Sequence, residues 1–91
     1  MPVRKRAHHS DRVEDGLGRD ISMGGIRIST DAKLDVGTKL NVEVNISESV
    51  KPYYAMGEVV WLKSNEGQTD KSFDIGIKFL RIVTKEDLEG F

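Results

Sequence analysis

The clearest structural pattern in this sequence is an unbroken alternation, KLNVEVNI, at residues 39–46. Its apolar members are Leu40, Val42, Val44 and Ile46, and a polar residue stands before each of them. Successive side chains of a β-strand point to opposite faces, so the four apolar side chains share one face. An apolar face opposite a polar face is typical of a half-buried antiparallel strand. The stretch therefore predicts a strand that packs one face on the core of a β-protein.

A second alternating stretch, FDIGIKF, occupies residues 73–79. Turn-forming residues separate the apolar stretches at 35–37 (DVG), at 49–52 (SVKP) and over the polar residues 64–72. We expect the last of these segments to be a loop that joins two strands of a hairpin. Short strands at this spacing are typical of a small barrel or sandwich. The fold class is therefore predicted to be all-β.

Residues 55–62, AMGEVVWL, form a further predicted strand that is apolar on both faces. Alternation places Val59 and Trp61 on one face, and Val60 and Leu62 on the other. Because neither face is polar, we expect another element or a partner to cover the second face. We expect Trp61 to lie in the core or beneath a terminal helix, with contact to a ligand base as the alternative.

Composition limits the class of protein. The 91 residues suffice for one domain with a modest core. Fourteen basic and 15 acidic residues give a net charge of −1, which argues against binding nucleic acid by bulk electrostatics. The absence of cysteine excludes disulfides and thiolate chemistry. No apolar run approaches the roughly 20 residues that cross a bilayer, and no apolar segment follows the basic amino terminus. We therefore expect a cytoplasmic domain without membrane insertion.

A short polar motif, DISMGG, occupies residues 20–25. On extended backbone, Asp20 and Ser22 project to the same side. A carboxylate accepts hydrogen bonds, and a hydroxyl both donates and accepts, so the pair could bind adjacent donors such as those of a guanine edge. We expect Gly24 and Gly25 to adopt positive φ and to let a ligand approach the main chain. The alternative is a simple hairpin turn, because turns also prefer Asp, Ser and Gly.

Asp20, Ser22 and Gly25 resemble the D/N-x-S-x-x-G signature of PilZ domains. Downstream, GEVVW at residues 57–61 and FDIGIKF at residues 73–79 resemble a strand pair of the same family. The resemblance implies a small six-stranded antiparallel β-barrel. It also implies binding of the bacterial second messenger cyclic di-GMP. Family members hold this ligand with the signature and with an R-x-x-x-R motif ahead of the first strand.

That second motif, R-x-x-x-R, is not present in this chain. The residues four places after Arg4 and Arg6 are His8 and Ser10. The tripeptide PVR at residues 2–4 resembles the start of the family's first strand. This likeness would place the missing arginines upstream of the first residue.

The first twelve residues are predicted to form a basic arm with a remnant of the first strand, followed by the barrel domain at residues 13–91. Residues 1–12 carry four basic side chains against one acidic side chain. We expect this arm to be mobile in the free protein and to be ordered by the ligand. The resemblance implies that the ligand contacts are Asp20, Ser22, Gly24 and Gly25, with Arg4 and Arg6 on the phosphates.

Catalytic and metal-binding patterns are weak in this sequence. His8 and His9 are adjacent without a third ligand at suitable spacing, and Ser22 has no histidine placed to act as its base. A short C-terminal helix is predicted to start at Thr84. We expect a non-enzymatic signalling or adaptor domain without a cofactor, which binds cyclic di-GMP and passes the signal to a protein partner. The alternative is a PilZ-like protein-interaction module that does not bind the nucleotide; no nucleic acid partner is expected.

Overall fold

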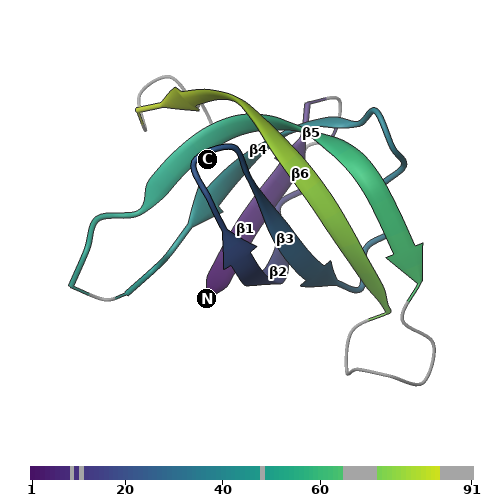
Figure 1. Cartoon of the computed structure of the whole chain (residues 1–91), viewed down its shortest axis with the longest axis horizontal. Coiled ribbons are helices and arrows are strands. Elements are labelled where there is room, and N and C mark those ends of the chain that lie inside the picture. The colour runs from purple at the N-terminus through teal and green to yellow at the C-terminus, as the bar shows by residue number, and fades with distance from the viewer. Residues whose placement is uncertain (9, 11, 48, 65–71, 85–91) are drawn as a thin grey trace.

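The computed structural model describes residues 1–8, 10, 12–47, 49–64 and 72–84. These residues form a closed barrel of antiparallel strands (Figure 1). The strands are β1 (Pro2–Ala7), β2 (Glu14–Ile21), β3 (Gly25–Thr30), β4 (Lys39–Val44), β5 (Tyr53–Ser64) and β6 (Phe73–Val83). Neighbours in the barrel follow the order β1-β2-β3-β6-β5-β4, and pairing of β1 with both β2 and β4 closes it. The predicted six-stranded all-β barrel is confirmed.

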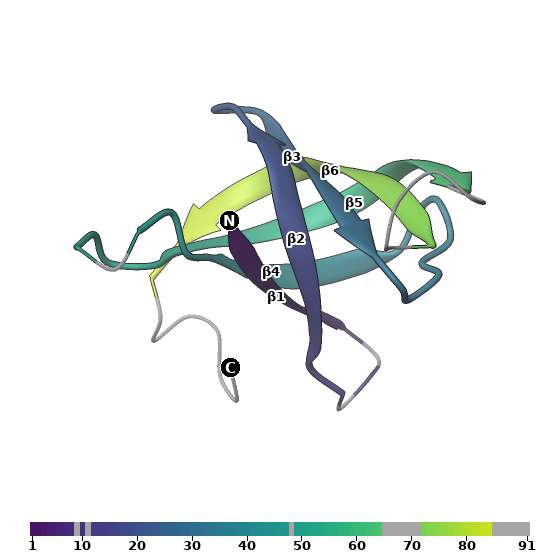
Figure 2. The ribbon, with the colours of Figure 1, turned by 90° about the horizontal axis from the view of Figure 1, so that it is seen from below.

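Two features of this barrel position the candidate ligand-binding site. The long strands β5 and β6 pair along most of their length and curve side by side across the molecule (Figure 1). The hairpin turn between β2 and β3 projects at the edge of the barrel, as the view from below shows (Figure 2). Because β3 also pairs with β6, this hairpin lies beside the long strands.

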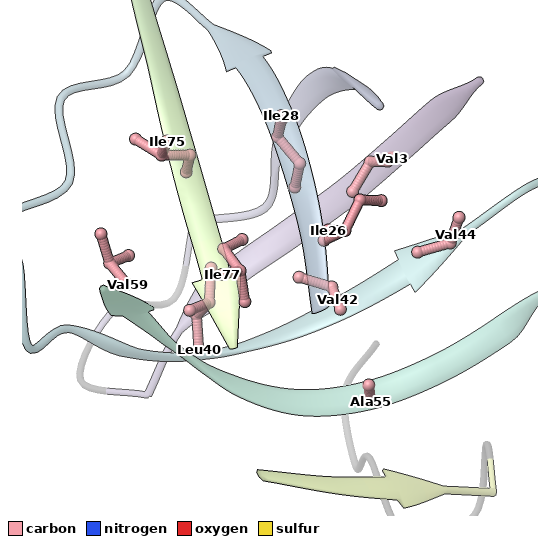
Figure 3. Packing of buried hydrophobic residues seen from close by; sticks show 10 residues of the cluster. All are labelled: Val3, Ile26, Ile28, Leu40, Val42, Val44, Ala55, Val59, Ile75 and Ile77. Atoms are coloured by element: carbon pink, nitrogen blue, oxygen red, sulfur yellow. The ribbon is translucent and has the colours of Figure 1, made fainter. Parts of the chain in front are cut away.

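Apolar side chains from five strands fill the interior, and Figure 3 shows them converging there. The buried cluster consists of Val3, Ile26, Ile28, Leu40, Val42, Val44, Ala55, Val59, Ile75 and Ile77. None of these residues comes from β2. In that strand Gly16 and Gly18 face the interior, where an added Cβ would meet the side chains of Ile28 and Val3. The glycines of β2 therefore leave room for the side chains of its neighbours.

The alternation at residues 39–46 predicted most of one barrel wall. Leu40, Val42 and Val44 are fully buried, as expected. The prediction was wrong for Ile46, which is exposed. Strand β4 ends at Val44, and the next amide, Asn45 N, donates to Pro2 O at 3.0 Å. Ile46 lies beyond this last hydrogen bond and so is no longer held over the core.

Lys5 is the unexpected member of the interior. Its side chain alternates inward with Val3 along β1, and the residue is only 1% exposed. The ammonium Nζ donates to Thr30 Oγ1 at 2.8 Å and to the carbonyl oxygen of Asp15 at 3.1 Å. A buried charge is tolerated when hydrogen bonds replace its lost hydration. These two acceptors explain how the barrel holds a lysine.

The two ends of the chain depart from the sequence expectations in different ways. Residues 2–7 form β1, which is bonded on both sides, so this part of the expected mobile arm is a wall of the barrel. Ligand binding therefore cannot act by ordering these residues. The helix predicted to follow Thr84 and most of the loop predicted at 64–72 lie outside the described residues, and both stay predictions. Within the described ranges, the structure has no helix of the length and apolarity that a membrane span requires.

Candidate ligand-binding site

The motif at residues 20–25 forms the turn that joins β2 to β3. Ser22 N donates to Gly25 O at 2.9 Å, and Gly24 N donates to Ser22 Oγ at 3.3 Å. Phe79 N in β6 donates to Gly24 O at 2.9 Å, which ties the turn to the neighbouring strand. The interpretation of this motif as a hairpin turn is therefore correct. The same turn also forms one side of a cavity.

The prediction of positive φ at Gly24 and Gly25 was wrong. Among the described residues, the glycine with positive φ is Gly37, at 95°. Gly25 is needed for a different reason: a Cβ there would overlap the carbonyl oxygen of Ile77, because β3 and β6 approach closely at this point. A Cβ on Gly24 would have no neighbour within 4 Å. The main chain at Gly24 is thus open to a ligand.

A β-bulge places Asp20 on the outer face of the barrel. Ile21 pairs with Ile26 and Asp20 with Arg27, but the next pair is Gly18 with Ile28, so Arg19 is the extra residue. Arg19 and Asp20 are consequently both exposed, although they are adjacent in sequence. Bulges commonly redirect a side chain beside a functional site.

A second bulge places Trp61 on the same outer face. Val59 pairs with Ile77 and Trp61 with Gly76, so Val60 is the extra residue in β5. Val59 is buried, whereas Val60 and Trp61 are exposed to 44% and 42%. The prediction that Val59 and Trp61 share a face was therefore wrong, because the bulge interrupts the alternation between them.

These registers align four residues in one row across neighbouring strands. Asp20 lies opposite Arg27, Arg27 opposite Gly76, and Gly76 opposite Trp61. With strands about 4.8 Å apart, the row extends for about 14 Å across the outer face. The indole of Trp61 lies over Gly76, where a Cβ would overlap its five-membered ring. Gly76 is thus covered by the indole of Trp61, and it is buried.

A cavity of about 270 Å³ follows this row. Its lining consists of Asp20, Ile21, Ser22, Gly25, Ile26, Arg27, Val60, Trp61, Gly76 and Ile77. The signature residues Asp20, Ser22 and Gly25 therefore meet in one place, whereas Gly24, in the turn between β2 and β3, is not part of the lining. Pockets for whole small molecules measure about 300–1,000 Å³. The cavity is of a size to take one part of a larger ligand, such as a single base.

The polar groups of this cavity are exposed. Asp20 Oδ2 lies 3.1 Å from Arg27 Nη2, and the two side chains are 77% and 44% exposed. Asp20 Oδ1 accepts no hydrogen bond from the described residues, so it remains available to accept one from a ligand. Exposed ion pairs of this kind contribute about 0–1 kcal/mol to stability. The pair thus contributes little to holding the fold together.

Arg4 and Arg6 lie elsewhere on the barrel. Arg4 pairs in register with Asp15 and Glu43, and its Nη1 lies 3.8 Å from Glu43 Oε1. Neither arginine is among the residues that line the cavity. Strand geometry puts the position of Asp15 roughly 15 Å from Asp20 along β2. A ligand would have to extend along this strand to meet Arg4, and the role of both arginines stays a prediction.

Sequence reasoning did not include Arg27 or Gly76 in the site. A signal for Arg27 was present: counting outward from the loop at residues 22–25 pairs position 21 with 26 and position 20 with 27. No comparable signal existed for Gly76. Its position opposite Trp61 depends on the bulge at Val60, which alternation does not predict.

The fold and the site together define a small closed β-barrel with a ligand-sized cavity on its outer face. The family model of the PilZ domain matches residues 1–91, and the chain belongs to this family. PilZ domains bind cyclic di-GMP or act as adaptors, and they are not a catalytic family. Searches among curated proteins and among solved structures gave no match.

Proposed function

We propose that this PilZ domain binds cyclic di-GMP, with one guanine in the cavity beside the β2–β3 turn. The observation that carries this proposal is the meeting of Asp20, Ser22 and Gly25 with an exposed Trp61 around a single cavity. Asp20 Oδ1 accepts from the N–H groups of the guanine edge. Ser22 Oγ, which is exposed, donates or accepts beside it.

Trp61 and Gly24 complete the binding surface. Stacking of a base on an aromatic side chain contributes about 1–3 kcal/mol, and the half-exposed indole of Trp61 offers a face for such stacking. The open main chain at Gly24 lets the ribose or phosphate approach without a steric obstacle. Arg4 and Arg6 act as phosphate contacts for parts of the ligand that extend along β2.

The test is a calorimetric titration of the protein with cyclic di-GMP, with GMP as the control ligand. The proposal expects saturable binding of the dinucleotide that is much tighter than binding of GMP. If cyclic di-GMP at millimolar concentration gives no binding heat, the proposal is overturned.

The second candidate is an interaction module that does not bind the nucleotide. It is favoured by the exposed apolar side chains of Leu80 and Ile82 on β6, each 50% exposed. It is also favoured by the position of Arg4 and Arg6 away from the cavity. Under this alternative, Asp20 and Ser22 serve the hairpin turn alone, and a protein partner covers β6.

A further inference from the structure

Arg27 lies in the candidate cavity but outside the family signature, and it contacts that signature directly. Its Nη2 approaches Asp20 Oδ2 at 3.1 Å. Guanidinium and carboxylate groups can pair through two parallel hydrogen bonds. Within the described ranges, Nε and Nη1 of Arg27 donate no hydrogen bond. The pairing therefore leaves donors of Arg27 available.

The position of Arg27 in the row explains why these donors matter. Its strand partners are Asp20 on one side and Gly76 on the other. Because Gly76 has no side chain, Arg27 is the cationic residue between Asp20 and Trp61 in this row. A ligand that reaches both Asp20 and Trp61 therefore passes over the guanidinium of Arg27.

We propose that Arg27 is the cationic contact of this site: Nη2 fixes the Asp20 carboxylate, and the remaining N–H groups donate to a phosphodiester oxygen of the same ligand. This inference rests on the proposed function. Arginine suits both tasks because its planar group carries five donors and stays charged. The carboxylate is held in place for the base while the phosphate charge is neutralised beside it.

The neighbouring Arg19 does not fill this role. Its Nε donates to Ser29 Oγ at 3.0 Å, and Ser29 Oγ donates to Asp74 Oδ1 at 2.7 Å. Arg19 is also absent from the cavity lining. Its Nε is bonded to Ser29, which also lies outside the cavity lining.

The arrangement predicts which dinucleotide the site selects. Guanine has N–H donors on the edge where adenine has an acceptor at N1, so a carboxylate favours guanine. Cyclic di-AMP carries the same phosphates as cyclic di-GMP but lacks this donor edge. Arg27 should therefore strengthen binding of both dinucleotides, while Asp20 should discriminate between them.

The experiment compares the wild type with Arg27→Gln, Arg27→Lys and Lys39→Gln by calorimetric titration with cyclic di-GMP at low and high salt. Lys39→Gln is the matched control: it removes one positive charge from a cross-strand ion pair with Glu58 that lies outside the cavity. We expect Arg27→Gln to weaken binding about tenfold or more, as for loss of a hydrogen bond to a charged group. It should also reduce the salt dependence. Arg27→Lys should fall between Arg27→Gln and wild type, and Lys39→Gln should match wild type.

A double-mutant cycle with Asp20→Ala separates the two roles of Arg27. If Arg27 binds phosphate, Arg27→Gln still weakens binding when Asp20 is absent, and that result supports the proposal. Equal affinity of Asp20→Ala and the double variant overturns the phosphate contact. If the wild type binds and folded Arg27→Gln binds equally well, the inference fails while the proposed function stands. If the wild type does not bind cyclic di-GMP, both fail.

Discussion

The indole of Trp61 lies on the backbone of Gly76, its partner across β5 and β6. A Cβ at Gly76 would overlap the ring atoms Nε1, Cε2 and Cδ1. The ring can take this position only because a bulge at Val60 turns Trp61 outward and because residue 76 has no side chain. One wall of the candidate cavity therefore depends on the pairing of these two residues.

Gly76→Ala should displace the indole from this position. The ring is 42% exposed and can swing toward solvent, so we expect a loss of about 1–3 kcal/mol in the free energy of unfolding, as for other overpacked sites. Trp61 is the single tryptophan of the chain, so its emission should shift to longer wavelength. Affinity for cyclic di-GMP should fall together with this shift. Unchanged emission and affinity would show that the ring does not rest on residue 76.

Asp20→Ala should weaken binding of cyclic di-GMP about ten- to a hundredfold, as expected for a hydrogen bond to a charged group. Stability should change by no more than about 1 kcal/mol, because the ion pair with Arg27 is exposed. Titration calorimetry measures the first effect and urea denaturation the second. Glu58→Ala, which removes a comparable cross-strand ion pair with Lys39 away from the cavity, is the control. Wild-type affinity in Asp20→Ala would remove Asp20 from the site.

Much of the fold followed from alternation because each wall of the barrel has one buried face. Leu40, Val42, Ile75 and Ile77 are buried as their pattern indicates. Alternation failed where the pairing register changes, at Val60. The bulge at Val60 requires no distinctive residue type. Alternation therefore places the adjacent side chains of Val60 and Trp61 on opposite faces, although both point outward.

The candidate site was predicted in part for a similar reason. Asp20 and Ser22 line one cavity as expected, since no bulge separates them. Arg27 and Trp61 come from other strands, and their approach depends on the register of the barrel. Lys5 was treated as part of a basic arm, because lysine seldom occupies an interior. Its acceptors are a side chain in β3 and a main-chain oxygen in β2, which a local reading of the sequence does not reveal.

Gly25→Ala and Gly24→Ala should behave differently, although the two glycines are adjacent. At residue 25 the new methyl group would overlap the carbonyl oxygen of Ile77, and backbone cannot move aside as a side chain can. We expect a loss of about 1–3 kcal/mol for Gly25→Ala. Gly24→Ala meets open space and should have wild-type stability. Thermal denaturation of both variants provides the comparison, and equal melting temperatures would contradict the close approach of β3 to β6.

Neutralising Arg4 and Arg6 together, as Arg4→Gln with Arg6→Gln, tests the contacts implied by the family resemblance. If they meet the phosphates, affinity for cyclic di-GMP should fall and its dependence on salt should flatten, because salt screens such attractions. Titrations at two salt concentrations measure both quantities. An affinity equal to that of wild type at each concentration would exclude both arginines from the ligand contacts and leave Arg27 as the candidate cation.

Lys5→Met and Lys5→Ala test whether the buried ammonium stabilises the barrel. Lys5→Met keeps most of the volume but removes the side-chain donor to the Asp15 carbonyl and one of the two donors to Thr30 Oγ1, which also accepts from Ala32 N; this should cost about 1–3 kcal/mol. Lys5→Ala adds the loss of the side-chain stem, and we expect about 2–4 kcal/mol by analogy with other large-to-small core changes. Urea denaturation measures both, with Lys39→Ala as the control for an exposed lysine. A Lys5→Met variant as stable as the wild type would show that its hydrogen bonds only offset the desolvation of the charge.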